Sequence, residues 1–363
     1  MRVKQISIKN FRNYPELQLD ITSDLVVLSG PNAVGKTNLL ESVYFASLFK
    51  SFRDDSEFIF MKNTTTAEVR VVVERRGQDH TIEIFLEQRD KIYANFKLDG
   101  VVKRRREVQG FLNVVIFEPE DVALFTASPE SRRRYLNMVL SQKDVQYLED
   151  IGNYKKVLSQ KNRVLQQIRG GGASQDDLIA WNEQIVKLGV PIIMHRKRFI
   201  SFLNQHFADI YSNISGFHRP VEVEYATLPG STMEEVENAL RKLLAEQTQR
   251  EIMLSTSLVG PHRDDFNLKS DGLFLSPFSS RGELRSQILS LKVLELEYLS
   301  KGEDKPVLLL DDVLSELDEQ RRTFLLKFLQ GKFQTFITTT HPLEMAAQHV
   351  TLTPSAQEEE YKA

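Results

Sequence analysis

A glycine-rich loop near the N-terminus carries the residues best suited to phosphate chemistry. The segment "GPNAVGKTN" fits the pattern G-x-x-x-x-G-K-[ST]. Its glycines let backbone N–H groups approach phosphate oxygens, Lys36 is suited to reach the β and γ phosphates, and Thr37 to bind a metal ion. Taken alone, the pattern also occurs by chance in glycine-bearing turns. The nucleotide site predicted here consists of Gly30, Pro31, Asn32, Ala33, Val34, Gly35, Lys36, Thr37 and Asn38.

Two adjacent carboxylates follow an apolar run in the last third of the sequence. The segment "PVLLLDD" is typical of a buried strand and ends at Asp311 and Asp312. Because a magnesium-holding segment of a phosphate-loop fold requires a carboxylate at this point, we predict that Asp311 and Thr37 hold Mg²⁺. Asp312 then stands where a base orients the attacking water; the simpler alternative is a surface acid after a strand.

Two further positions suit contact with phosphate. "SSRGEL" opens a helical run, so Ser280, Gly282 and nearby amides are predicted to form another anion site at a helix start. The alternative for this pair is an ordinary helix cap. "ITTTH" ends a third apolar strand with His341, which we predict to sense the γ-phosphate, although a lone histidine is usually structural.

Strands and helices in a fixed order must position these residues. The run from Leu25 to Gly30 is apolar throughout, as a strand buried on both faces is, and the helical pattern "NLLESVYFASLF" follows the loop. Alternating residues predict antiparallel strands before it and after it, with a hairpin turn at Asp99 and Gly100. The later strands are predicted at Thr65 to Arg75, Thr81 to Glu87 and Tyr93 to Leu98.

The middle of the chain changes to a helical period. Apolar residues from about Asp144 follow a 3,4 spacing that Lys161 interrupts, and "RGGGAS" breaks the helix. A second helical region starts near Gln175, with a kink or break expected at Pro191. A strand near Val221 to Tyr225 and a helix near Met233 to Gln247 come next. We therefore predict an α/β nucleotide-binding lobe built from residues 1–125 and 251–363, with a mostly helical lobe, residues 126–250, inserted between them.

Composition narrows the class of protein. A length of 363 residues suits two or three domains. With 47 basic and 50 acidic residues the net charge is −3, so any binding to nucleic acid must come from local patches. The absence of cysteine excludes disulfides and thiolate metal sites. The N-terminus lacks a signal-peptide pattern and no stretch is apolar enough to span a bilayer, so we expect a soluble, cytoplasmic protein without a membrane partner.

The order of these motifs resembles a known superfamily. Phosphate loop, "S-x-G" helix start, "LLLDD", "SELD" and strand-end histidine follow one another as in ATP-binding-cassette ATPases. More closely, the chain resembles the bacterial RecF family over nearly its whole length. The segments that carry this resemblance are "IKNFRNY", "GPNAVGKTN", "FEPEDVALFTASPESRRRYLN", "GPHRDDF" and "PVLLLDDVLSELD". The last three are far more specific than the phosphate loop.

This resemblance implies a fold, an activity and partners. The implied fold is a cassette-type P-loop ATPase core with an antiparallel β flank and an inserted mostly helical lobe. The implied activity is ATP- and Mg²⁺-dependent binding of single- and double-stranded DNA and gap junctions in recombinational repair. Two ATP molecules would be held between the subunits of an ATP-dependent homodimer, which would help RecO and RecR to load RecA.

The resemblance also assigns roles to individual residues. Lys36, Thr37 and Asp311 would bind nucleotide and metal, Asp312 would take the base position, and Arg12 and Asn13 would contact the nucleotide. Ser280, Gly282 and Glu283 would form the signature that meets the γ-phosphate on the opposite subunit, and the loop from Ser315 to Asp318 would cross the dimer interface.

The sequence departs from the pattern at three points. Glu283 stands where the signature commonly has Gln, and Asp312 is one methylene shorter than the usual Glu base. Both changes are compatible with slow hydrolysis, which fits a switch better than a motor. The Gln that normally links the core to the helical lobe has no equivalent in "IFEPEDV".

Three basic runs are candidates for contact with DNA phosphates. They are Lys103, Arg104, Arg105 and Arg106; Arg132, Arg133 and Arg134; and Arg196, Lys197 and Arg198. Charge runs are usually solvated faces or structural pairs, so each run has a structural alternative. Phosphate contacts would be insensitive to base sequence.

Three other functions are alternatives to an ATP-gated DNA-binding switch. An ATPase subunit of a transporter is disfavoured because Lys36 and Ser280 lie 244 positions apart, against roughly a hundred in that pattern. An SMC-like chromosome-organising ATPase would need a longer coiled coil than this helical segment provides. A nuclease-linked ATPase should carry a second acidic cluster after the cassette, where we expect only the polar, disordered tail "SAQEEEYKA".

Overall fold

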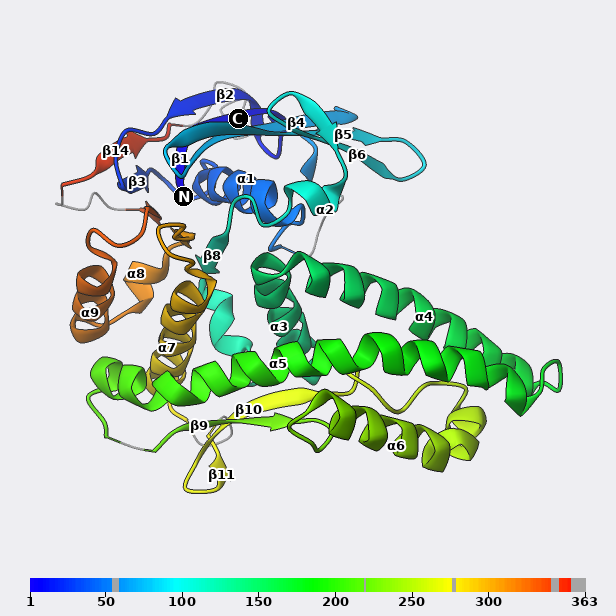
Figure 1. The fold of residues 1–363 in the computed structure, drawn as a ribbon. Coiled ribbons are helices and arrows are strands. Elements are labelled where there is room, and N and C mark those ends of the chain that lie inside the picture. Colours follow the sequence, from blue (N-terminus) through cyan, green and yellow to red (C-terminus); the bar gives the residue numbers. More distant parts are fainter. Residues whose placement is uncertain (54–58, 219, 276–278, 341–345, 354–363) are drawn as a thin grey trace. The chain divides into compact units, whose positions relative to one another are not determined.

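The computed structural model describes residues 1–53, 59–218, 220–275, 279–340 and 346–353, and these residues divide into two units (Figure 1). Unit 1 comprises the described parts of Met1–Val122, Asn213–Ser215 and Arg285–Ala363. Unit 2 comprises those of Ala123–Ser212 and Gly216–Leu284. The fold class predicted from the sequence is confirmed: a parallel sheet, an antiparallel sheet and a mostly helical insert are all present.

A five-stranded parallel sheet forms the centre of unit 1, in the order β14-β3-β13-β12-β8. Its strands are β3 (Leu25–Ser29), β8 (Val114–Phe117), β12 (Val307–Leu310), β13 (Thr335–Thr339) and β14 (Gln348–Thr351). The strands come from both ends of the chain, as predicted. β3, β12 and β13 each have a strand on either side, and nearly all of their residues are buried.

A six-stranded antiparallel sheet forms the flank of unit 1, in the order β2-β1-β4-β5-β6-β7. Its strands are β1 (Arg2–Phe11), β2 (Tyr14–Asp20), β4 (Thr66–Arg75), β5 (Gln78–Gln88), β6 (Ile92–Leu98) and β7 (Val101–Lys103). Alternate residues of β4 are buried, which is why its sequence alternates. Asp99 and Gly100 turn β6 into β7 with φ angles of 53° and 75°, as the predicted hairpin requires.

Helix α1 (Lys36–Leu48) packs against both sheets of unit 1 (Figure 1). This position explains its sequence, because a helix covered on all sides needs no polar stripe. Its buried residues include Glu41 and Ser42 as well as the apolar ones. The remaining helical segments with most of their length in unit 1 are α2 (Arg105–Val108), η2 (Pro119–Ala123), α7 (Arg281–Leu299), α8 (Val313–Glu316) and α9 (Glu319–Leu329).

Long helices dominate unit 2. They are α3 (Pro129–Lys143), α4 (Val145–Arg169), α5 (Leu178–Ser215) and α6 (Met233–Leu254), with a short turn η3 (Gln175–Asp177) before α5. The break predicted at "RGGGAS" is confirmed, since α4 ends at Arg169. Of the kink or break expected at Pro191, the break is wrong, because α5 continues through the proline. Val190, Ile192 and Ile193 are buried beside the proline, so tertiary packing holds the helix together there.

A three-stranded antiparallel sheet completes unit 2, in the order β11-β10-β9. Its strands are β9 (Glu222–Ala226), β10 (Asp265–Ser270) and β11 (Leu273–Phe274). This sheet corrects the predicted boundary at residue 251. Because β10 pairs with β9, residues 251–284 belong to unit 2, and the chain returns to unit 1 at Arg285.

Lys161, read from the sequence as an interruption of the α4 stripe, lies in the core of unit 2. Its side chain is fully buried, and its ammonium lies 2.7 Å from a carboxylate oxygen of Glu251. Ser257 accepts a further hydrogen bond from Lys161 and donates one to Glu251. A buried charge is tolerated when it is paired and hydrogen-bonded in this way.

The segment "GPHRDDF" forms a second buried polar cluster in unit 2. Arg196 donates to the carbonyl of Pro261 at 2.6 Å and to Asp264 at 3.0 Å, and Tyr225 and Thr227 also donate to Asp264. His262 accepts from the Tyr154 hydroxyl at Nδ1 and donates from Nε2 to the Ser257 carbonyl in its neutral form. These contacts give the motif a structural role in joining β10 to the helices.

We expect acid to destabilise unit 2 through His262. Burial lowers the pKa of His262 from 6.5 to about 4. The unfolded chain therefore takes up the proton first, and stability falls as the pH drops from 6.5 towards 4, by up to about 1.4 kcal/mol per pH unit. Urea unfolding followed by fluorescence of Trp181, the one tryptophan of the sequence, would measure it.

The matched control for this experiment is the exposed His218. His262→Gln should flatten the dependence of unfolding free energy on pH in this window, and His218→Gln should leave it as in the unaltered chain. An equal pH dependence in both variants would contradict the assignment to His262.

Candidate nucleotide-binding site

The carboxyl ends of four parallel strands of unit 1 meet at one edge of the sheet. The register pairs Leu310 of β12 with Phe117 of β8 and with Ile337 of β13, and Thr339 of β13 with Ser29 of β3. The phosphate loop, Asp311 and the residue after β8 therefore follow adjacent strand ends. In open α/β sheets ligands bind at this edge, which makes it the candidate site.

Two glycines of the phosphate loop cannot be replaced without a clash. Gly30 has φ of 153°, and a Cβ there would lie 2.5 Å from the carbonyl oxygen of Leu352. Gly35 has φ of 106°, and a Cβ there would lie 2.7 Å from the side chains of Asn13 and Tyr14. Gly35 immediately precedes α1, so the loop delivers its backbone amides to a helix N-terminus, where anions are favoured.

Lys36 lies inside the loop. Its side chain is buried, and the ammonium donates hydrogen bonds to the carbonyl oxygens of Gly30 and Pro31, each at 2.9 Å. The positive charge is thus held in the segment whose amides would receive a phosphate. Contact of Lys36 with the β and γ phosphates stays a prediction.

Thr37 and Asp311, predicted as magnesium ligands from positions far apart in sequence, lie in direct contact. The Thr37 hydroxyl donates to Oδ1 of Asp311 at 2.9 Å, and Thr338 donates to the same oxygen at 2.7 Å. Burial raises the pKa of Asp311, while these two hydrogen bonds lower it. A hydroxyl and a carboxylate are hard oxygen ligands, so this pair fits Mg²⁺ shared with nucleotide phosphates.

A metal site built only from protein carboxylates and histidines would differ from the Thr37–Asp311 pair. The described residues contain no group of three or more His, Asp and Glu side chains able to hold a metal. The Thr37–Asp311 pair therefore suits an ion that takes most of its ligands from phosphate and water.

Asp312 begins α8 with φ of 52°, a left-handed conformation. Its N–H donates to the Thr338 hydroxyl at 2.9 Å, and its carbonyl accepts from Ser315 at 2.6 Å. Thr338 thus orients both acidic residues at once. Asp312 is partly exposed and follows Asp311 directly. Its role as the base stays a prediction.

Arg12 and Asn13, predicted as nucleotide contacts, support the loop in this structure. Nε of Arg12 donates to the fully buried Glu41 at 2.9 Å. The Asn13 amide donates to the Val34 carbonyl at 3.3 Å and accepts from Asn38 at 2.8 Å. Their contact with a nucleotide stays a prediction.

Sequence reasoning missed Arg53, an exposed cation near this edge. It donates to the Asn38 side chain at 2.9 Å. Burial has the largest effect on the pKa of Asp311 and raises it, whereas the positive charge of Arg53 lowers it. Arg53 lies outside every sequence motif, so no pattern pointed to it.

Glu118 is a second missed residue at this edge. It follows Phe117, whose carbonyl accepts the Asp311 N–H at 3.0 Å, so it stands beside Asp311 at the next strand end. Burial, and then the negative charge of Asp121, raise the pKa of Glu118 to about 8. The carboxyl ends of adjacent parallel strands lie close together. Applied to the strand in "IFEPEDV", this rule predicts Glu118 beside Asp311.

The predicted signature residues begin α7. The Ser280 N–H donates to Glu283 at 2.8 Å, and the Glu283 N–H donates to the Ser280 hydroxyl at 3.3 Å. This reciprocal pair is a capping box, a role that either Glu or Gln can fill at this position. Ser280 is exposed and Gly282 partly so. The predicted sensor His341 lies outside the described residues.

The basic runs divide into buried and exposed side chains. Arg132 is buried and its Nε donates to Asp265 at 2.7 Å, and Arg196 is held by Asp264, so neither is available to DNA and that prediction is wrong for both. Arg133 donates to the Asp264 carbonyl and Arg105 to the Leu48 carbonyl. Lys103 and Arg104 lie within 4.0 Å of Glu107. The exposed members are Arg104, Arg106, Arg134 and Arg198.

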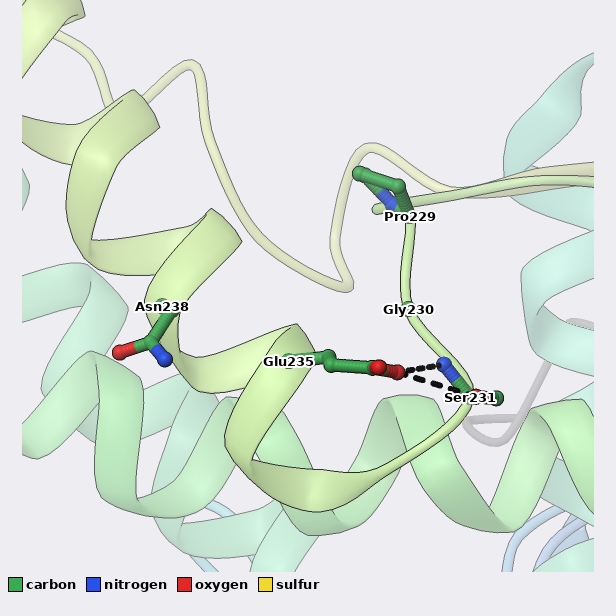
Figure 2. Close-up of a pocket in the computed structure, with 5 residues that line it drawn as sticks. All are labelled: Pro229, Gly230, Ser231, Glu235 and Asn238. Atoms are coloured by element: carbon green, nitrogen blue, oxygen red, sulfur yellow. Dashed lines mark hydrogen bonds between the residues drawn. The ribbon is translucent and has the colours of Figure 1, made fainter.

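A surface hollow at the start of α6 is not a second anion site (Figure 2). It is lined by Pro229, Gly230, Ser231, Glu235 and Asn238. The Glu235 carboxylate accepts from the backbone N–H groups of Ser231 and Thr232, and these bonds lower its pKa to about 2. A negative side chain already takes the helix-start amides, so a further anion is disfavoured.

No helix among the described residues is both long and apolar enough to cross a membrane.

Comparisons with known proteins find relatives over nearly the whole chain. The RecF/RecN/SMC N terminal domain family matches residues 2–361. The DNA replication and repair protein RecF of Lachnoclostridium phytofermentans is 35% identical over 94% of this chain and 93% of its own length. The corresponding protein of Lysinibacillus sphaericus is 36% identical, with the same shares covered.

Solved structures give the same result. A structure of the recombination mediator protein RecF with ATP, in the RecFOR pathway, has a TM-score of 0.89 at 31% identity, covering 96% of this chain and 95% of that one. A second RecF structure, described as RecF-ATPrS, has a TM-score of 0.90 at 31% identity, covering 97% and 96%. An Smc head at 13% identity shares the fold alone, with a TM-score of 0.54 over 96% of this chain and 93% of that one.

Proposed function

The chain belongs to the RecF family of DNA replication and repair proteins, and from this premise we propose that it is an ATP-dependent DNA-binding switch of recombinational repair and replication restart. The observation that carries the proposal is the contact of Thr37 with Asp311 beside a loop that encloses Lys36. These three side chains are the ones that a Mg–ATP site of a P-loop ATPase needs.

ATP would lie with its phosphates on the loop from Gly30 to Asn38. Thr37 and Asp311 would hold Mg²⁺, which would neutralise charge on the β and γ phosphates. Asp312 would orient the attacking water, and its short side chain suits slow turnover. The slow ATPase would then act as a timer for a DNA-bound state.

Dimerisation on ATP would complete the site. Ser280, Gly282 and Glu283 would meet the γ-phosphate bound to the opposite subunit, and the segment from Ser315 to Asp318 would cross the interface. The exposure of Ser280 supports this proposal, because the residue is available to a second subunit. His341 would sense the γ-phosphate.

The dimer would bind gapped or double-stranded DNA and, with RecO and RecR, promote loading of RecA. A RecF structure with ATP, described as belonging to the RecFOR pathway, supports RecO and RecR as partners. Among the predicted DNA contacts, the exposed Arg104, Arg106, Arg134 and Arg198 remain candidates.

Self-association measured with and without nucleotide tests the proposal. Analytical ultracentrifugation should show a shift from monomer to dimer with Mg–ATP and no shift with Mg–ADP. Fluorescence anisotropy of labelled gapped DNA should show retention in ATP and weaker retention in ADP. DNA binding of equal strength in ATP, ADP and nucleotide-free buffer would overturn the switch.

A further inference from the structure

Helix α4 carries a long segment without acidic residues. Positions 151–175 contain five basic residues and no Asp or Glu, although the chain has 50 acidic residues among 363. One of the five, Lys161, is buried and paired with Glu251. The other four, Lys155, Lys156, Arg163 and Arg169, are exposed.

The two faces of α4 differ sharply. Tyr147, Tyr154, Val157 and Leu165 are buried, and α4 packs there beside α5, where Arg196 donates to the Tyr147 hydroxyl (Figure 1). From residue 152 onward the exposed face holds only cations, amides, a hydroxyl and glycine. Its members are Gly152, Asn153, Lys155, Lys156, Ser159, Gln160, Arg163, Gln166, Gln167 and Arg169.

These four cations differ from the basic runs singled out in the sequence. In the part of the chain that the structure describes, no carboxylate lies within 4.0 Å of Lys155, Lys156, Arg163 or Arg169. Lys103 and Arg104, by contrast, lie near Glu107, and Arg132 is bound to Asp265. No neighbouring carboxylate therefore competes with a ligand for the α4 cations.

The chemistry of the face favours a polyanion over a protein or a membrane. Protein interfaces depend on buried aromatic or apolar anchors, and membrane-surface helices on an apolar face. No large apolar side chain is exposed on α4 after Val145. Amides and hydroxyls interleaved with Lys and Arg are the donors that contact phosphate oxygens.

The dimensions fit a nucleic-acid backbone. From Lys155 to Arg169 the helix rises about 21 Å, at 1.5 Å per residue. That length faces about six phosphates of one strand at 3.4 Å per nucleotide.

We propose that the exposed face of α4 (Gly152–Arg169) binds the sugar–phosphate backbone of DNA without reading its base sequence. The proposal rests on the proposed DNA-binding function and names a surface for it. All four cations contribute to affinity and to its salt dependence, and ATP binding does not depend on them, because none belongs to the nucleotide site.

The test compares two double variants with the same loss of charge. Lys156→Gln/Arg163→Gln changes the α4 face, and Lys242→Gln/Arg250→Gln changes exposed cations of α6, where Lys242 has Glu246 as a neighbour. Glutamine keeps helix propensity in both. Anisotropy of two labelled duplexes of unrelated sequence, in Mg–ATP at several salt concentrations, gives affinity and salt slope.

The α4 double variant should bind both duplexes about tenfold or more weakly at low salt, with a slope of log K against log salt shallower by about 1.8, or about 0.9 per lost phosphate contact. Adding Lys155→Gln and Arg169→Gln should make it shallower by about 3.6. The α6 control should bind as the unaltered chain does. Far-ultraviolet circular dichroism and the ATP dissociation constant should be unchanged in all variants.

The other outcomes distinguish failure of the proposed function from failure of the α4 assignment. If the unaltered chain fails to bind DNA in Mg–ATP, the proposed function fails and this surface with it. If the unaltered chain binds and the α4 variant matches the α6 control, only the α4 assignment fails. Loss of binding to anionic lipid vesicles with unchanged DNA affinity would assign the face to a membrane and overturn the DNA proposal.

Discussion

Replacing Lys36 with alanine is expected to abolish ATP-dependent retention of DNA while the protein stays folded. The Lys36 ammonium donates to two carbonyls of its own loop and to no group of the apolar core, so the fold loses little. The nucleotide loses charge-assisted hydrogen bonds worth about 3 kcal/mol, which is about 100-fold in affinity. Without bound ATP the proposed switch has no DNA-binding state.

Lys9→Ala is the matched control, because Lys9 is an exposed lysine on β1 of the same unit. Isothermal titration with ATP and anisotropy with gapped DNA should separate the two variants, while thermal unfolding should not. A Lys36→Ala protein that holds DNA as tightly as the Lys9→Ala protein at saturating ATP would contradict the coupling of ATP to DNA.

The central sheet was predictable because its strands carry their own signal. A strand buried on both faces is largely apolar, as β12 is throughout and β3 is from Leu25 to Leu28. A glycine loop follows β3, and paired acids follow β12. The contact of Thr37 with Asp311 followed from the order of those motifs and the rule that parallel strand ends share an edge.

Long-range pairing explains the errors in the fold. The sequence around Asp265 to Ser270 reads as a strand in either unit, and only its register with β9 assigns it to unit 2. In the sequence Lys161 interrupts the apolar 3,4 spacing of a helix, because its partner Glu251 is distant along the chain. Neither pairing leaves a local pattern.

The errors in the site have two origins. Arg132 and Arg134 are neighbours in one basic run, yet one is bound to Asp265 and the other is exposed. Charge in a sequence does not show which cation already has a partner. Glu118 has a different reason: the family pattern leads one to expect a glutamine in "IFEPEDV", and the strand end presents an acid.

Mixing two inactive variants should restore ATPase activity if the site is shared between subunits. Asp312→Asn should keep ATP and lose the base, and Ser280→Arg should block the signature that meets the opposite nucleotide. Each variant alone should be nearly inactive, because both sites of a two-fold symmetric dimer carry the lesion. In a heterodimer both lesions fall in one site, and the other site keeps its Asp312 and Ser280.

With equal amounts, random pairing and independent sites, about a quarter of the unaltered activity should return. A mixture of Lys36→Ala with Asp312→Asn is the control, because each of these lesions lies beside its own subunit's phosphate loop. Every heterodimer site then carries one lesion, and no activity should return. A tagged pull-down establishes that heterodimers are present in both mixtures. Should the Ser280→Arg mixture stay as inactive as the control, Ser280 acts within its own subunit or only caps α7, and the shared-site dimer is untenable for this chain.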